Sequence, residues 1–249
     1  MNEIEHPTPG VRVERREALK LGGLLAALPL AGSLAPRWGQ ADREPRDPID
    51  GPRDAFEEFA ALWKELAETY LEPTPELEEP YLYRLASHIT AQVLDAVPPR
   101  QRKVFESPSL ATGPAWFMGP IFIVVLTVEP GAVIAPHNHP GHNVVTVGLS
   151  GSAHYRHYEL RGETPPFEDH ATRFRVQETR RGILRRGRTS HLARHRDNIH
   201  TFQAGAEGAV LLDFTTELGG REFGMLAIDE PPLDAFHGVH EAHWKEHAW

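Results

Sequence analysis

Apolar and polar side chains in the N-terminal part of the chain recur with helical spacing. Between residues 53 and 71, apolar positions return every three or four residues, while glutamates and a lysine occupy the opposite face. Pro73 ends this segment, and Thr74 with Pro75 resembles the start of a second helix that continues to about Val97. The pattern therefore predicts two successive helices.

Further along the chain, the apolar positions form short runs instead. Residues 121–128, apolar apart from Thr127 and bounded by Pro120 and Pro130, predict a buried strand. A polar, proline-bearing loop is expected at 161–172. The other strands predicted from short runs between glycine, proline or charged turns are 132–136, 143–149, 152–160, 173–178, 183–188 and 209–216. Many short strands without intervening helices predict a mainly β fold, a sandwich or barrel behind the two helices.

Charge and composition narrow the kind of partner and the kind of site. The chain has 249 residues and a net charge of −9, which suits one domain with extensions and argues against nucleic-acid binding. It has no cysteine, so any metal site must use histidine, carboxylate, amide or water ligands. Nine arginines lie between Arg173 and Arg196, and we interpret them as a solvated sheet edge or loop.

The first 41 residues have the pattern of an export signal. Arg15 and Arg16 precede an uncharged apolar run, residues 21–35, which is short for a membrane span. The segment resembles a twin-arginine signal peptide with cleavage after Ala41. The resemblance implies passage through the twin-arginine translocase, a periplasmic or extracellular location and no membrane span after cleavage. A buried or amphipathic N-terminal helix is the alternative.

A histidine-rich segment after the first strands has the spacing of a metal site. His137 and His139 are two residues apart, so in a strand both imidazoles face the same side. With Gly131 before them and Gly151 after them, they resemble the first motif of the cupins. That resemblance implies a jelly-roll barrel, the cupin double-stranded β-helix. Asn143 stands where that motif usually has a glutamate ligand, which favours a three-histidine site with open positions.

The third ligand is expected from a later strand. His200 follows an Asp-Asn turn and precedes an apolar strand, whereas its competitors His191 and His195 lie among arginines. The alternative is that these histidines are hydrogen-bonded core residues, as in barrels that bind small molecules without a metal.

Two segments also resemble the thiol dioxygenases, in the plant cysteine oxidase and 2-aminoethanethiol dioxygenase branch. They are the His-Asn-His-Pro-Gly run at 137–141 and the Asn-Ile-His-Thr-Phe run at 198–202, within a similarity that spans about 116–214. The resemblance implies Fe(II) held by the three histidines, with dioxygen and a small thiol such as cysteine or cysteamine as substrates. It also implies a pocket role for Asp213, with a surface acid as the alternative. Manganese, nickel or zinc are alternative metals.

Other features leave the reaction open. The tyrosine that follows the aspartate in that branch has no counterpart in 214–220, and one extra residue precedes Asp213. Tyr155 shares a strand face with His157 and is a second candidate catalytic residue. Another metal-dependent enzyme, such as a non-thiol dioxygenase, lyase or isomerase, or a non-catalytic ligand-binding protein of the cell envelope, fits the same pattern. The oligomeric state stays open.

The resulting organisation has four parts. A signal peptide at 1–41 is followed by a linker and helical extension at 42–105 and by the barrel at 106–231. The histidine-rich tail, 232–249, is expected to be exposed and amphipathic, with weak zinc or copper binding on one helical face as the alternative.

Overall fold

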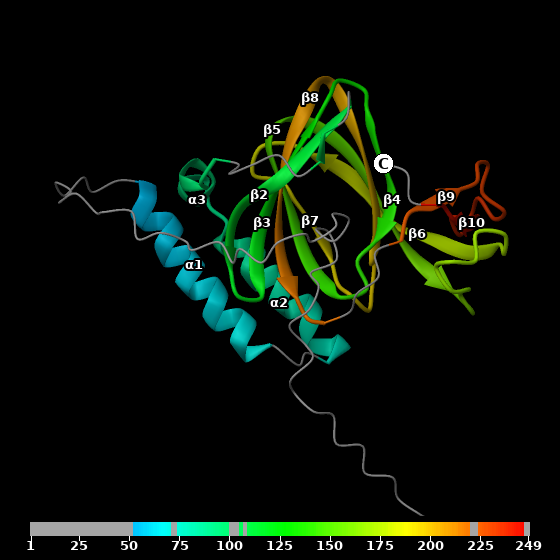
Figure 1. The fold of residues 1–249 in the computed structure, drawn as a ribbon, viewed down its shortest axis with the longest axis horizontal. Coiled ribbons are helices and arrows are strands. Elements are labelled where there is room, and N and C mark those ends of the chain that lie inside the picture. Colours follow the sequence, from blue (N-terminus) through cyan, green and yellow to red (C-terminus); the bar gives the residue numbers. More distant parts are fainter. Residues whose placement is uncertain (1–51, 71–73, 100–104, 107–108, 220–223, 247–249) are drawn as a thin grey trace, which may run out of the picture.

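The computed structural model describes residues 52–70, 74–99, 105–106, 109–219 and 224–246. The predicted signal peptide lies outside these residues. Three helices, α1 (Pro52–Thr69), α2 (Pro75–His88) and α3 (Ala91–Ala96), lie against one side of a curled antiparallel sheet (Figure 1). Among the described helices, none combines the length and the apolar character needed to cross a membrane.

The second predicted helix is two helices in the structure. The Ile89 amide donates to the Ala86 carbonyl at 3.2 Å, and this bond ends α2. The Thr90 side chain then accepts a bond from the Val93 amide at 3.3 Å and caps α3. Apolar periodicity continues across the break because Ile89 is itself buried, so the sequence pattern conceals it. At the start of α2, Thr74 makes no side-chain capping bond, while Pro75 occupies the first turn as expected.

The strands account for most of the remaining chain. They are β1 (Phe105–Glu106), β2 (Leu110–Met118), β3 (Ile121–Val128), β4 (Val133–Asn138), β5 (His142–Arg161), β6 (Phe174–Leu184), β7 (Thr189–Leu192), β8 (Ile199–Glu217), β9 (Leu226–Ile228) and β10 (Val239–Trp244). Their order is β1-β2-β3-β8-β5-β6-β10-β9, with β4 beside β8 and β7 beside β5. The predicted mainly β fold behind N-terminal helices is confirmed.

Two long strands, β5 and β8, hold the barrel together. The first half of β5 pairs with the second half of β8 and with β7, whereas its second half pairs with the first half of β8 and with β6. Each long strand therefore takes part in both walls of the barrel. The bend falls at Gly151, where φ is +64° and an added Cβ would collide with the carbonyl oxygen of Gly208. Glycine is needed at this position for both reasons.

Alternate residues of these strands divide the packing into an outer and an inner layer. On β8, Leu212 and Phe214 pack against the helices, whereas Leu211 lies in a separate cluster with Phe202 inside the barrel. Trp63 of α1 is central to the outer layer, with its ring centroid 5.6 Å from that of Phe214. Asp213, between two outward-facing residues, therefore faces the barrel interior.

The C-terminal segment is part of the sheet, and the predicted amphipathic tail is wrong. Strand β10 pairs with β6 and with β9, and Trp244 is 1% exposed. The segment Val-His-Glu-Ala-His-Trp alternates buried and half-buried positions, which is a strand period. Its many histidines make the same residues resemble a helical face.

A buried ion pair connects the helices to the barrel. Glu78 of α2 is fully buried and accepts a hydrogen bond from Arg194 Nε at 2.7 Å. The Arg194 amide donates to Asn143 Oδ1 at 2.9 Å, and its guanidinium contacts the Leu218 carbonyl at 3.3 Å. These contacts join α2 to β5, to the end of β8 and to the loop before His200.

Removing one partner of this pair should destabilise the whole domain. We expect Glu78→Gln to lower the free energy of unfolding by about 3–5 kcal/mol, because the Arg194 charge would remain largely buried without its carboxylate. Urea denaturation would measure the loss. Lys64→Met is the matched control, since its pair with Glu68 is exposed and should contribute less than about 1 kcal/mol. Equal effects of the two substitutions would contradict the role assigned to Glu78.

Candidate metal centre

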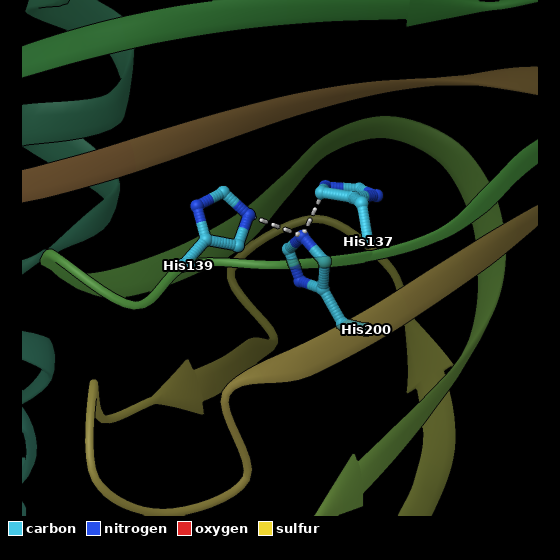
Figure 2. Close-up of side chains that lie close together, drawn as sticks. All are labelled: His137, His139 and His200. Atoms are coloured by element: carbon cyan, nitrogen blue, oxygen red, sulfur yellow. Dashed lines mark hydrogen bonds between the residues drawn. The ribbon is translucent and has the colours of Figure 1, made fainter. Parts of the chain in front are cut away.

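The structure brings the three predicted metal ligands together. His137 lies in β4 directly opposite His200 of β8, and His139 follows at the end of β4. Figure 2 shows the three imidazoles pointing toward one another. The His200 Nε2 atom lies 2.8 Å from His137 Nε2 and 3.1 Å from His139 Nε2. Within the described residues, this is the one group of three or more His, Cys, Asp or Glu side chains whose potential ligand atoms converge.

Backbone carbonyls fix the orientation of the His137 ring and the position of the His139 backbone. His137 Nδ1 lies 2.8 Å from the Ala135 carbonyl, to which it donates, so its Nε2 carries the lone pair that faces the cluster. The His139 amide donates to the Asn198 carbonyl at 2.9 Å, which ties the end of β4 to the turn before His200. The register of β4 on β8 therefore determines where the imidazoles meet.

Burial keeps all three imidazoles neutral. Their exposed fractions are 6%, 8% and 0% for His137, His139 and His200. Desolvation lowers the pKa of His137 to about 4, and it lowers the pKa values of His139 and His200 well below their usual range, helped by the neighbouring imidazoles. Neutral imidazole is the form that binds a metal.

The spacing of the nitrogens fits a transition metal. A metal about 2.0–2.1 Å from each of two neighbouring nitrogens holds them roughly 3 Å apart, and the two measured separations agree with that value. In neutral imidazoles each ring has one nitrogen with a free lone pair, which is the atom that binds a metal. These residues can therefore hold a metal ion, and imidazole suits iron, zinc, nickel or copper.

Asn143 does not face this cluster. Its side-chain oxygen accepts the Arg194 amide, and it lies on the opposite face of β5 from Thr146, which contacts Asp213. The neighbouring position on the inner face is the fully buried Val144. Asn143 therefore adds no ligand to the three histidines, as its amide side chain had suggested.

Asp213 is a buried carboxyl on the inner face, outside the three-histidine group. It accepts a hydrogen bond from the Thr146 hydroxyl at 2.6 Å. Burial raises its pKa to about 7, although the Thr146 bond opposes the shift. The extra residue before Asp213 therefore does not turn it outward, and the surface alternative is wrong for this residue. A role in catalysis stays a prediction.

Tyr155 lies near the three histidines, but its neighbour His157 lies closer to His200. The Tyr155 ring is half-buried against Gly182, with its centroid 5.0 Å from that of His157. The fully buried His157 lies opposite His200 on the adjacent strand, with ring centroids 6.3 Å apart. The strand alternation placed both residues on one face, but nothing in the sequence indicated that His157 was the nearer one.

Three other histidines considered as ligands or pocket residues do not belong to the cluster. His142 lies next to it, with its ring centroid 6.2 Å from that of His139 and 6.2 Å from that of Phe122. The competitor ligands His191 and His195 line a separate cavity beside α2. Neither residue belongs to the three-histidine cluster, which agrees with the prediction of His200 as the third ligand.

Comparisons with known proteins give distant structural similarities only. No family model matches the chain, and no curated protein matches it. KdgF from Halomonas sp. is 18% identical, with a TM-score of 0.33, over 45% of this chain and 84% of that chain. A Klebsiella pneumoniae protein described as uncharacterized, with a double-stranded beta-helix domain, is 16% identical, with a TM-score of 0.36, over 53% and 92% of the two chains. Vicilin from Capsicum annuum is 15% identical, with a TM-score of 0.38, over 51% and 33%.

The raised pKa of Asp213 predicts a pH-dependent stability. The folded carboxyl keeps its proton up to about pH 7, whereas the unfolded one loses it near its ordinary pKa of 3.8. The wild type should therefore lose stability as the pH rises from 4 to 7, by about 1.4 kcal/mol for each unit of displacement. Asp213→Asn should remove this loss. The free energy of unfolding of the variant should therefore rise relative to that of the wild type between pH 4 and pH 8.

Urea denaturation with a chelator at both pH values would measure the difference. Asp95→Asn changes an exposed carboxyl and serves as the control. A constant stability gap between Asp213→Asn and the wild type would contradict the burial of an ionisable carboxyl here.

Proposed function

We propose that the protein is a metal-dependent cupin-type enzyme that uses Fe(II) and dioxygen to oxidise a small thiol to a sulfinic acid. The observation that carries the proposal is the convergence of three neutral, buried imidazoles, which no carboxylate from the described residues joins. Such a ligand set leaves coordination positions for both substrates. The sequence similarity to the thiol dioxygenases at 137–141 and 198–202 supports the choice of reaction.

The reaction is balanced without a further reductant. The thiolate RS⁻ and O₂ give RSO₂⁻, so both oxygen atoms enter the product, sulfur is oxidised by four electrons and dioxygen is reduced. Bound iron would supply the redox chemistry. Cysteine and cysteamine are the thiols we propose.

The chain's own residues supply orientation and protons. His137, His139 and His200 would hold the metal, and the Ala135 carbonyl fixes the tautomer of the first. Asp213, held by Thr146, offers a carboxyl that exchanges a proton near neutral pH. The substrate thiol must lose its proton to react as a thiolate, and we propose that Asp213, on the inner face of the barrel, accepts it.

The same carboxyl favours a second candidate function. A buried acid with a pKa near 7 suits proton transfer in a metal-dependent lyase or isomerase, with manganese, nickel or zinc in the histidine site. Such an enzyme would consume no oxygen, and its rate would depend on a group of pKa about 7 that Asp213→Asn removes.

Metal content and oxygen uptake test the proposal together. We expect the anaerobically loaded protein to retain about one iron per chain, and to consume oxygen only when a thiol is added. His200→Ala should abolish both, because two nitrogens hold the ion poorly. His154→Ala is the matched control, since His154 is exposed on the outer face of β5.

Each result decides between the candidates. Iron that binds through His200 without thiol-dependent uptake would reject the thiol oxidation and leave the lyase or isomerase. Metal content unaffected by His200→Ala would reject the metal centre itself.

We also propose that the protein is exported by the twin-arginine translocase, as its first 41 residues suggest. Arg15→Lys together with Arg16→Lys should retain the chain in the cytoplasm, and replacing Arg37 and Arg43 with lysine should not. Fractionation of cells followed by immunoblotting would show the distribution. Equal export of the two variants would reject this route.

A further inference from the structure

The inner face of β3 carries a row of apolar side chains that are only partly buried. The residues of this strand that face the helices are closely packed, and Ile121 and Ile123 are both 0% exposed. Phe122, Val124 and Leu126 alternate with them, so they face the barrel interior, and each of the three keeps some accessible surface. We call these three residues the inner apolar row.

The accessible surface of this row does not come from a free edge of the sheet. Every residue of β3 pairs with β2 on one side and with β8 on the other. In this register Val124 lies opposite Asp213, and residues that lie opposite each other project to the same face. The row therefore shares the inner face with the buried Asp213 carboxyl, and its accessible surface is on the interior side of the sheet.

A series of ring contacts connects the row to the metal centre. The Phe122 ring centroid is 6.2 Å from that of His142, which in turn is 6.2 Å from that of the ligand His139. On its other side, Phe122 stacks on Phe117 with 6.2 Å between the ring centroids, and Phe117 is 67% exposed. The rings extend from the protein surface to a metal ligand, so the row lies beside the site at which a substrate would react.

The deeper end of the barrel interior shows that inner apolar residues can pack fully in this fold. Leu211 and Phe202, in the inner cluster, are both 0% exposed, and Leu126 packs against that cluster. The interior is therefore filled beyond Leu126, whereas Phe122 and Val124 retain apolar surface nearer the metal centre. A ligand that covers this surface gains the free energy of apolar burial.

The charges near the row exclude an acidic ligand group. The strands β2 and β3, the first half of β5 (142–151) and the second half of β8 (209–217) contain no lysine or arginine. The acids of this part of β8 are Asp213 and Glu217, which alternation places on the same face. A carboxylate on the ligand would meet these acids without a cation to pair with it. An ammonium group would bring its hydration shell against apolar side chains.

We propose that the inner apolar row binds the substituent of the substrate, and that the preferred thiol carries an uncharged alkyl or aromatic group. Pockets for small molecules combine such apolar walls with a few polar groups that orient the reacting end, here the three histidines and Asp213. The inference rests on the thiol chemistry proposed above and goes beyond it by naming the substituent. A thiol of this class should bind more tightly than cysteine or cysteamine.

Three thiols with the same two-carbon chain test the substituent. 2-Phenylethanethiol, 2-mercaptoethanol and cysteamine differ only in the terminal group, which is a phenyl ring, a hydroxyl or an ammonium group. Titration calorimetry with the full chain, loaded with Fe(II) and kept under nitrogen, would give the dissociation constants without oxidation. We expect 2-phenylethanethiol to bind about tenfold or more tightly than either of the other two.

Two substitutions in the row, each with a matched control, locate the binding surface. Phe122→Ala removes the ring beside His142, and Phe236→Ala makes the same change at a side chain that is 91% exposed. Val124→Thr replaces a methyl group by a hydroxyl of similar size, and Val133→Thr does so at a position that is 57% exposed.

The two row variants should weaken 2-phenylethanethiol selectively. We expect a loss of about tenfold for Phe122→Ala and about threefold for Val124→Thr, while the affinity for 2-mercaptoethanol stays within about twofold. Unchanged binding of 2-mercaptoethanol would also show that the variants are folded and hold the metal. No preference for 2-phenylethanethiol in the wild type, equal losses in the row and control variants, or equal losses for the two thiols would overturn the inference.

Oxygen uptake separates this inference from the proposed reaction. Preferential binding of 2-phenylethanethiol without uptake would reject thiol oxidation and keep the apolar site. Thiol-dependent uptake with the same KM for all three thiols would keep the reaction and reject the site. 2-Phenylethanol, which has no sulfur, extends the comparison: if it binds in a manner that Phe122→Ala abolishes while no thiol binds, the site stands and the thiol chemistry falls.

Discussion

The pairing of β5 with β8 is the constraint on which the rest of the structure depends. Both strands bend and exchange partners halfway, so their pairing, which shifts register near Gly151, forms part of both barrel walls. The ladder places His200 opposite His157, and β4 adds to it with His137 opposite His200. A slip of one residue would turn each imidazole to the other face of its sheet. The metal centre is therefore specified by backbone pairing more than by contacts among the histidines.

The helices stabilise this arrangement from outside. Their apolar faces cover the wall formed by β3, β8 and β5, where the aromatic rings of Trp63 and Phe214 pack together. A buried ion pair joins α2 to the segment that leads into His200. The same segment supplies the carbonyl that accepts the His139 backbone amide. The helical extension thus holds both the metal ligands and the neighbouring cavity in place, although it contributes no ligand.

Local patterns in the sequence predicted the elements well, and contacts between distant segments account for the differences. The apolar run 121–128 coincides with β3, and the spacing of His137, His139 and His200 gave the cluster that the structure assembles. The break after α2 was missed because Ile89 keeps the helical period of burial. The ion pair between Arg180 and Asp197 could not be predicted, since only folding brings β6 and the β7–β8 segment together.

The position of β10 affects the order in which the molecule can be completed. This strand covers the edge of β6, yet more than fifty residues separate the two in the chain. During synthesis the ribosome releases β6 long before its neighbour, and an uncovered edge can pair with a strand of another chain. In a nascent molecule the β6 edge therefore stays unpaired until residue 244 has emerged from the ribosome. Chaperone occupancy of that edge would be most useful in this interval.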